Sequence, residues 1–236
     1  MIDAQSDRDP ERAGEPVEFA ANGSTAGGYL SVPASGSGPG VLVIQEWWGL
    51  NDQICGIADR FARAGYNALA PDLYEGRVTQ EPDEANHMMS GLDFPGATHQ
   101  DIRGAALHLQ DLAPNGDGKV AVMGFCMGGA LTIAAAVHVP EISVGVCFYG
   151  IPPAEFADPA KISLPLQCHF ANQDDWCTPA AVDELEATLT AAGANAEIHR
   201  YDAAHGFFNE TSEAAYDATS ANLAWRRMSE FLAANQ

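Results

Sequence analysis

The strongest chemical signal in the sequence is a cysteine set among small residues. Residues 124–129 read Gly-Phe-Cys-Met-Gly-Gly and stand between the apolar run 120–123 and the alanine-rich stretch 130–137. Small residues two places before and after a nucleophile permit a tight turn from strand to helix, the nucleophile elbow, here with cysteine in place of serine. The helix would point amide groups at Cys126, lower the pKa of its thiol and favour the thiolate. The pattern predicts that Cys126 is a nucleophile.

A general base and an acid that orients it follow in the order that such elbows use, which is nucleophile, acid, histidine. Asp174 and its neighbour Asp175 come just after the apolar segment 164–171, and His205 comes just after the next segment, 196–201. Of the seven histidines, His205 alone stands both beyond a predicted strand and after the acid. We therefore predict His205 as the base. We favour Asp174 over Asp175 as the orienting acid, although a solvated turn would explain either aspartate.

Three other interpretations of the cysteine remain open at this point. Cys126 could be a small buried hydrophobic residue, which is how we interpret Cys147 and Cys168. It could be a redox-sensing thiol, but nothing near it in the sequence resembles a resolving cysteine. The domain could also be catalytically silent and act as a small-molecule binding protein. That alternative predicts a broken triad, whereas all three members are present.

The charge balance excludes some classes of partner. The chain has 236 residues with 32 acidic and 11 basic side chains, for a formal net charge of −21. Such a field repels nucleic acid and anionic membrane surfaces, so we expect neither as a partner. The composition suits a surface tuned for solubility or adapted to high salt. We expect a monomer or a weak homo-oligomer.

Targeting, redox and cofactor signals favour a cytoplasmic protein that works without a cofactor. No apolar run approaches the roughly 20 residues that span a bilayer, and the N-terminus lacks the features of a secretory signal. The five cysteines form no Cys-x-x-Cys pair, which favours free thiols in a reducing compartment. Because the sequence has no metal-binding spacing and no glycine-rich phosphate loop, we expect no metal and no organic cofactor.

The elements that must position these residues alternate between strand and helix. Buried strands are predicted at residues 40–44, 66–70, 119–124, 143–148, 164–171 and 196–201, helices at 54–62, 97–112, 127–137, 179–192 and 214–234, a hairpin at 17–20 and 28–32, and turns at 22–24 and 114–118. Apolar strands separated by helices indicate a mostly parallel, doubly wound α/β sheet flanked by helices. We expect one such domain over residues 17–236, after a flexible segment at residues 1–16.

Short motifs along the chain resemble those of the dienelactone hydrolase family. They are Ile-Gln-Glu-Trp-Trp-Gly at residues 44–49, Ala-Pro-Asp-Leu-Tyr at 70–74, the elbow at 124–129, Phe-Tyr-Gly at 148–150, Gln-Asp at 173–174 and His-Gly-Phe at 205–207. Each motif is weak alone, but together and in this order they are specific. The resemblance implies an α/β-hydrolase fold and cleavage of a small ester or lactone through a thioester on Cys126.

The resemblance also implies roles for residues that spacing alone does not identify. Glu46 would otherwise be taken for a surface carboxylate at a strand end. The family match implies that it contacts the resting thiol and helps to deprotonate the cysteine when substrate arrives. The amides of Met127 and Trp47 are the implied oxyanion-hole donors. Aromatic residues are implied as pocket walls, although the core explains each about as well: Trp47, Trp48, Tyr74, Tyr149 and Phe207.

The sequence departs from the family where substrate would be held. Family members that act on dienelactone have two arginines that grip its carboxylate. Here Asn209 stands at the second of these positions, and Gly76 stands at the first with Arg77 one place later. Arg77 and Asn209 are predicted to contact substrate, but they cannot form the paired arginine clamp. Because a bidentate arginine contact with a carboxylate is strong, its loss predicts weaker action on anionic lactones than on neutral esters.

Overall fold

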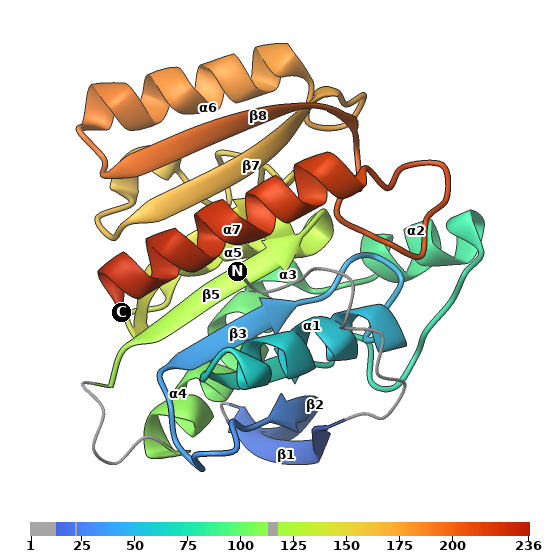
Figure 1. Ribbon diagram of the computed structural model, residues 1–236, viewed down its shortest axis with the longest axis vertical. Coiled ribbons are helices and arrows are strands. Elements are labelled where there is room, and N and C mark those ends of the chain that lie inside the picture. The colour runs from blue at the N-terminus through green and yellow to red at the C-terminus, as the bar shows by residue number, and fades with distance from the viewer. Residues whose placement is uncertain (1–12, 22, 113–117) are drawn as a thin grey trace.

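An eight-stranded sheet forms the centre of the molecule (Figure 1). The computed structural model describes residues 13–21, 23–112 and 118–236. The strands lie in the order β1-β2-β4-β3-β5-β6-β7-β8, in which β1 and β2 pair antiparallel and the others run parallel to one another. Their bounds are β1 (Glu15–Ala21), β2 (Ser24–Ser31), β3 (Gly40–Ile44), β4 (Asn67–Pro71), β5 (Val120–Phe125), β6 (Ile142–Phe148), β7 (Leu166–Gln173) and β8 (Ala196–Ala204).

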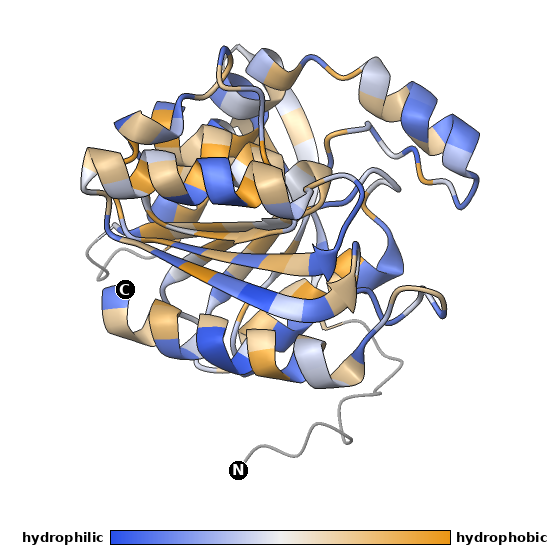
Figure 2. Ribbon diagram, turned by 90° about the horizontal axis from the view of Figure 1, so that it is seen from above, coloured by the Kyte–Doolittle hydropathy of each residue, from blue (hydrophilic) through white to orange (hydrophobic). Residues whose placement is uncertain are grey.

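Helices cover both faces of this sheet, as the view from above shows (Figure 2). In Figure 1, α1 and α7 lie in front of the sheet and α4 and α5 lie behind it. The helical segments are α1 (Asp52–Arg63), α2 (Pro82–Ser90), α3 (Phe94–Gly96), the π-helical turn η1 (Ala97–Ile102), α4 (Arg103–Leu112), α5 (Met127–His138), the 3-10 turn η2 (Pro159–Lys161), α6 (Pro179–Ala192) and α7 (Ala218–Asn235).

The central strands are buried on both faces because helices cover both. Every residue of β3, β4 and β5 is buried, as expected for parallel strands between two helical layers. The apolar runs in the sequence therefore mark the middle of the sheet. The carboxyl ends of these strands meet at one edge, where Cys126 follows β5, Asp174 follows β7 and His205 follows β8.

The predicted fold class is confirmed, and several element bounds differ from the prediction. The helix expected over 97–112 is split into η1 and α4, and the last helix begins at Ala218 rather than at residue 214. Helix α2 was not predicted, because only Ala85 and Met88 of its nine residues are buried. Such a helix carries almost no apolar periodicity.

Part of the prediction for the N-terminus and the turns lies outside the described residues. Residues 1–12 of the expected flexible segment are among these, as are Asn22 of the first expected turn and residues 114–117 of the second. Within the described part, β1 begins at Glu15, two residues before the expected strand. The backbone just before it is held: the Gly14 amide donates to Tyr29 Oη at 2.8 Å.

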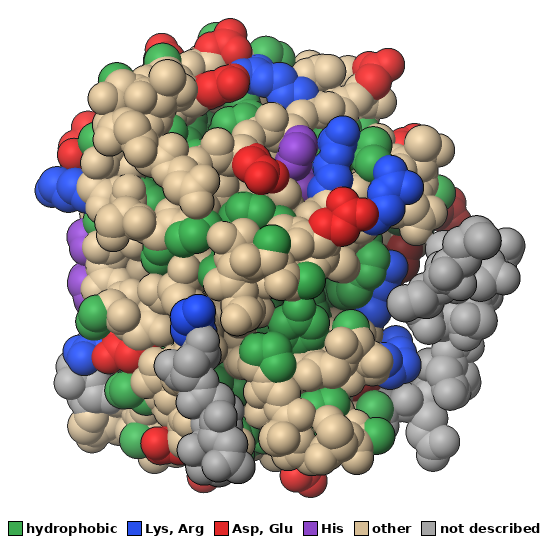
Figure 3. All heavy atoms as spheres, turned by 60° about the vertical axis from the view of Figure 1, so that its left-hand side comes forward, with side chains coloured by type: hydrophobic (Ala, Val, Ile, Leu, Met, Phe, Trp, Pro, Cys, Tyr) green, Lys and Arg blue, Asp and Glu red, His purple; other side chains and the backbone are tan. Residues whose placement is uncertain are grey.

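Among the described residues, neither the distribution of charge on the face shown in Figure 3 nor the helices single out a special surface. On the face shown in Figure 3, acidic and basic side chains lie interspersed rather than gathered into one patch of a single sign. In the part of the chain that the structure describes, no helix combines the length and apolar character that a membrane span requires.

Candidate active site

Cys126 stands at a sharp turn between β5 and α5. Its backbone has φ 55° and ψ −116°, a conformation that costs a non-glycine residue about 1–3 kcal/mol. Two hydrogen bonds hold the turn: the Cys126 amide donates to the Phe148 carbonyl oxygen at 3.0 Å, and the Ala130 amide donates to the Cys126 carbonyl oxygen at 3.1 Å. The nucleophile elbow predicted from the sequence is therefore present, with Cys126 at its apex.

The glycines around Cys126 permit close contact between backbones. A Cβ atom on Gly124 would collide with the backbone of Gly128 across the turn, and one on Gly128 would lie 2.5 Å from the carbonyl oxygens of Ile44 and Gln45. The elbow therefore packs directly against the end of β3. This packing brings Cys126 close to Glu46, which follows that strand.

His205 and Asp174 form a hydrogen-bonded pair beside the elbow. His205 Nδ1 lies 2.8 Å from Asp174 Oδ2. The other carboxylate oxygen of Asp174 accepts the backbone amides of Trp176 at 2.7 Å and Cys177 at 2.9 Å. Asp174 is buried whereas Asp175 is exposed, so geometry selects Asp174 as the partner of His205.

Burial and nearby charges shift the pKa values of Cys126 and His205 in opposite directions. Burial raises the pKa of the Cys126 thiol, although hydrogen bonds from His205 and from the Met127 amide favour the thiolate. Burial alone would lower the pKa of His205, but its interactions with Asp174 and Cys126 raise it to about 10. That value describes an imidazolium between two negative charges. The arrangement thus favours transfer of the thiol proton to His205 over loss of that proton to water.

The expectation that the elbow lowers the pKa of the thiol is wrong in sign. The Met127 amide at the start of α5 does favour the thiolate, as the elbow predicts. Removal of the sulfur from water outweighs this effect, because burial penalises the charged form. Glu46 acts in the same direction as burial, since its negative charge also raises the pKa of Cys126.

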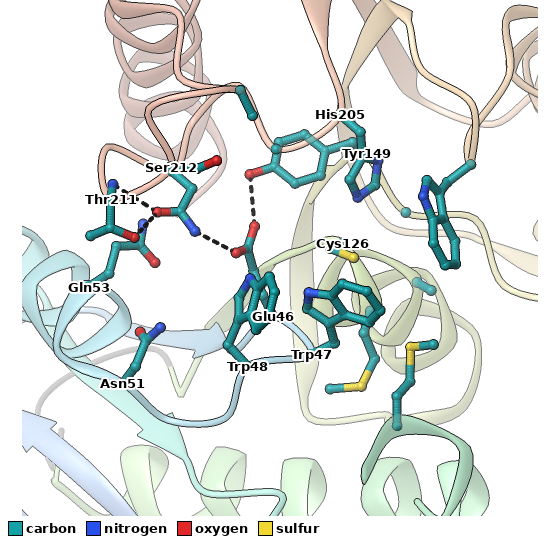
Figure 4. A pocket seen from close by; sticks show the side chains of 18 of the residues that line it. Glu46, Trp47, Trp48, Asn51, Gln53, Cys126, Tyr149, His205, Thr211 and Ser212 are labelled. Atoms are coloured by element: carbon teal, nitrogen blue, oxygen red, sulfur yellow. Dashed lines mark hydrogen bonds between the residues drawn. The ribbon is translucent and has the colours of Figure 1, made fainter. Parts of the chain in front are cut away.

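Glu46 is buried and held by two side chains that meet over the pocket (Figure 4). Tyr149 Oη donates to Glu46 Oε1 at 3.2 Å, and Asn209 Nδ2 donates to Glu46 Oε2 at 2.7 Å. Burial raises the pKa of Glu46, while these hydrogen bonds oppose the rise. One carboxylate oxygen of Glu46 is therefore bound to Tyr149 and the other to Asn209. Glu46 affects the pKa of Cys126 through its charge.

Asn209 has a different part in the site from the one predicted. Its Nδ2 group donates to Glu46, and its Oδ1 atom accepts the Thr211 amide at 3.0 Å and the Thr211 hydroxyl at 2.6 Å. Asn209 is itself buried. At the position where the related family members carry a substrate-gripping arginine, this chain has a side chain whose polar atoms bind the protein.

Cys126 and His205 open into a pocket of about 1060 Å³. Trp47, Trp48 and Trp176 line it, and the Trp47 ring centroid lies 4.9 Å from that of Trp48 and 5.7 Å from that of Trp176. Among the described residues that line the pocket there is no lysine or arginine. The pocket therefore has several aromatic side chains beside Cys126, and His205 is the one side chain of its described lining that can carry a positive charge.

Some of the predicted pocket residues lie elsewhere. Trp48, Tyr149 and Asn209 line the pocket, as predicted. Tyr74 and Phe207 are buried in the core instead, where the Tyr74 hydroxyl lies 3.1 Å from the Met127 sulfur. The sequence left a core position as the alternative for every aromatic residue. That alternative is correct for Tyr74 and Phe207.

Arg77 also lies away from the pocket. It is exposed and absent from the pocket lining, and its Nε atom donates to the Tyr74 carbonyl oxygen at 3.4 Å. The predicted contact between Arg77 and substrate is not supported by this placement, because its guanidinium is engaged with the turn that follows β4. Of the two predicted oxyanion residues, Met127 and Trp47, both line the pocket, and the Met127 amide hydrogen-bonds to the Cys126 sulfur.

Several pocket residues were not predicted from the sequence. They include Leu50, Asn51, Gln53, Met89, Phe94, Ile151, Pro153 and Trp176. The sequence does mark the start of α1, because Asn51 is a typical N-cap residue. In the structure its Oδ1 atom accepts the Ile54 amide at 3.1 Å. Met89 and Phe94 come from the segment of α2 and α3. There Pro82 after Glu81 and the acidic Asp83 mark a helix start that the missing periodicity concealed.

Similarity to known proteins agrees with the geometry. The model of the dienelactone hydrolase family matches residues 26–235. "Protein usf" of Aquifex pyrophilus is 34% identical over 219 residues, covering 90% of this chain and 94% of that protein. A "Putative carboxymethylenebutenolidase" of Aquifex aeolicus is 30% identical over 219 residues, with the same two coverages of 90% and 94%.

A solved structure shows the same architecture. The crystal structure of a "Putative Dienelactone Hydrolase" from Klebsiella pneumoniae superposes with a TM-score of 0.77 at 26% identity, covering 94% of this chain and 99% of that one. Because the family model spans nearly all of the described residues, the similarity covers the sheet, the elbow and the pocket together. We conclude that the chain belongs to the dienelactone hydrolase family, a family of hydrolases.

Proposed function

We propose that this protein hydrolyses small carboxylic esters or lactones through a thioester formed on Cys126. The observation that carries the proposal is the joint placement of Cys126, His205 and Asp174 at one edge of the sheet, with the sulfur and the imidazole facing a single pocket. A nucleophile, a base and a residue that orients the base are the groups that acyl transfer requires.

The acylation step follows from the position of each group. Because His205 Nδ1 is engaged with Asp174, its Nε2 atom is the one available to take the thiol proton. As this proton moves to His205, the Cys126 sulfur attacks the carbonyl carbon. The oxyanion is bound by the amides of Met127 and Trp47. When the tetrahedral intermediate collapses, the imidazolium returns its proton to the leaving alkoxide, and the thioester remains.

In deacylation, His205 takes a proton from water and then returns a proton to the sulfur. His205 takes a proton from a water molecule, whose oxygen attacks the thioester carbonyl, and collapse of the second intermediate releases the carboxylic acid. The sulfur leaves as a thiolate and recovers its proton from His205. Net consumption is one water per ester, without an external oxidant or reductant.

Glu46 and burial set the resting state of the nucleophile. Both raise the pKa of the Cys126 thiol, which favours the protonated thiol in the resting enzyme. Proton transfer to His205 then accompanies the attack on substrate. A resting thiol is less prone than a thiolate to react with stray electrophiles and oxidants.

The pocket favours neutral esters over carboxylate-bearing lactones. Its titratable lining includes the acidic Glu46 and Asp52, and its described lining contains no arginine or lysine. Asn209 cannot form a bidentate ionic contact, and its amide is engaged with Glu46 and Thr211. Apart from His205, which the mechanism uses as the base, a carboxylate in this pocket would lose hydration without gaining a counter-charge.

Hydrolysis of p-nitrophenyl acetate and of a dienelactone, measured side by side, tests the proposal. We expect wild type to cleave the acetate more efficiently than the dienelactone. Cys126→Ala should lower kcat/KM for the acetate by roughly 10⁴-fold or more, as losses of a nucleophile typically do. If Cys126→Ala keeps wild-type activity, the nucleophile is wrong. If wild type cleaves neither compound, the catalytically silent binding protein becomes the better account.

A further inference from the structure

We infer that the part of the pocket around Gln53 binds a hydroxyl group of the substrate, with the side-chain oxygen of Gln53 as the hydrogen-bond acceptor. This inference rests on the proposed function and specifies its substrate class. Gln53 is the second residue of α1, lines the pocket, and is only 6% exposed. Figure 4 shows it beside Asn51 and Thr211, with Glu46 between this group and Cys126.

The orientation of the Gln53 amide is fixed by a neighbouring carboxylate. Gln53 Nε2 donates to Glu210 Oε2 at 3.3 Å. Because an ionised carboxylate only accepts hydrogen bonds, the NH₂ group must face Glu210 and the oxygen must face the other way. The Gln53 amide therefore presents an acceptor, rather than a donor, away from Glu210.

That acceptor is buried and has no hydrogen-bond partner among the described residues. Buried side-chain oxygens are nearly always hydrogen-bonded in folded proteins, since an unmade bond carries the full cost of desolvation. Gln53 lines the pocket, so a small movement of its side chain would let a ligand in the pocket supply the missing partner. The chemical requirement on that partner is a hydrogen-bond donor.

The surrounding groups narrow the choice of donor. Two donors in this part of the pocket already have partners: Asn209 Nδ2 is bound to Glu46, and the Thr211 hydroxyl is bound to Asn209. The charged side chains there, Asp52 and Glu210, are acidic and disfavour a carboxylate. A substrate hydroxyl, which is neutral and can donate, satisfies both conditions.

The test uses p-nitrophenyl benzoates that differ in one substituent at the 3 or 4 position: methyl, hydroxymethyl or formyl. The hydroxymethyl group donates, the formyl group of similar size only accepts, and the methyl group does neither. Each kcat/KM is divided by the rate of alkaline hydrolysis of the same ester, which removes electronic effects. Wild type should prefer the hydroxymethyl ester in at least one positional series by roughly three- to tenfold, the range expected for one net hydrogen bond.

Three variants connect this preference to Gln53. Gln53→Met keeps the length of the side chain and removes the acceptor, so the three corrected rates should become equal within twofold. Gln80→Met is the matched control at an exposed position of the same pocket, and it should retain the wild-type ratio. Glu210→Lys replaces the carboxylate by a donor, which should turn the Gln53 amide around and shift the preference from hydroxymethyl towards formyl.

The outcomes separate this inference from the proposed function. Equal corrected rates in wild type, or a hydroxymethyl preference that survives in Gln53→Met, overturn the inference while leaving ester hydrolysis intact. If Gln53→Met does not fold, an unchanged ratio in Glu210→Lys overturns it. If no ester is cleaved, calorimetric binding of hydroxymethyl- and methyl-acetophenone decides. Tighter binding of the hydroxymethyl ketone keeps the subsite without the hydrolase, and equal binding removes both.

Discussion

Cys126 and Cys147 are thiols at neighbouring strands, and they differ in what surrounds them. Cys126 directly follows β5, and Cys147 lies within β6, where it pairs with Gly124 of β5. Burial raises the pKa of both thiols. Cys126 faces His205 and the pocket, whereas Cys147 donates to the Gly150 carbonyl oxygen at 3.0 Å.

The difference shows that burial alone does not decide whether a cysteine is reactive. Cys147 has Cys168 beside it, and this neighbour raises its pKa further. Cys126 has an imidazole that can take its proton and an amide that favours its thiolate. On the proposed mechanism, Cys126 differs from Cys147 because it faces the pocket and has a proton acceptor beside it. Substitutions that change His205, the groups around it or the second cysteine test this difference.

Among changes that leave Cys126 in place, the largest effect should come from loss of the carboxylate that orients His205. Asp174→Asn should lower kcat/KM for p-nitrophenyl acetate by about 10²- to 10⁴-fold, because an amide can hold the imidazole in the wrong tautomer. The neighbouring Asp175→Asn is the control, and it should stay within twofold of wild type since Asp175 is exposed and His205 binds Asp174. Similar losses in both variants would contradict the assignment.

A smaller effect should appear in the pH dependence of alkylation by iodoacetamide, followed by peptide mass spectrometry. The Cys126 midpoint should lie above the value of about 8.5 for a free cysteine, because burial raises its pKa. His205→Gln should move the midpoint up, since the interaction with His205 favours the thiolate. Glu46→Gln should move it down, since the negative charge of Glu46 disfavours the thiolate. Shifts in the opposite directions would refute this electrostatic account.

The smallest effect on activity should come from the other thiol. Cys147→Ala should keep kcat/KM within about threefold of wild type and lower the free energy of unfolding by about 1 kcal/mol, as a typical core truncation does. Urea denaturation and ester hydrolysis measure the two quantities on the same sample. A loss of activity as large as that of Cys126→Ala would erase the distinction between the two cysteines.

The sequence allowed Cys126, Asp174 and His205 to be predicted as neighbours, as the structure has them, because their signals are local. Cys126, Asp174 and His205 each directly follow a strand. Strand β5 and most of β7 are buried and recognisable as apolar runs, whereas β8 at the edge of the sheet is only partly buried. Parallel strands bring their carboxyl ends to one edge, so residues far apart in the chain meet there. The predicted fold class was correct for the same reason.

The remaining features of the site depend on contacts between distant segments. The hydrogen bonds of Glu46 with Tyr149 and Asn209 join three separate loops, and no local spacing encodes them. The direction of the Cys126 pKa shift was also predicted wrongly. The elbow pattern reports the helix start, which lowers this pKa, but it does not report how far the sulfur is removed from water.

The most direct test of the account is intact-mass analysis of the enzyme quenched in acid during turnover of p-nitrophenyl acetate. We predict a fraction of protein carrying one added acetyl group, located by peptide mapping on Cys126, and lost on treatment with neutral hydroxylamine as a thioester is. Cys126→Ala should carry none, and Cys147→Ala should acetylate like wild type. Turnover with an acetyl group on another residue, or with full activity in Cys126→Ala, would contradict the thioester mechanism.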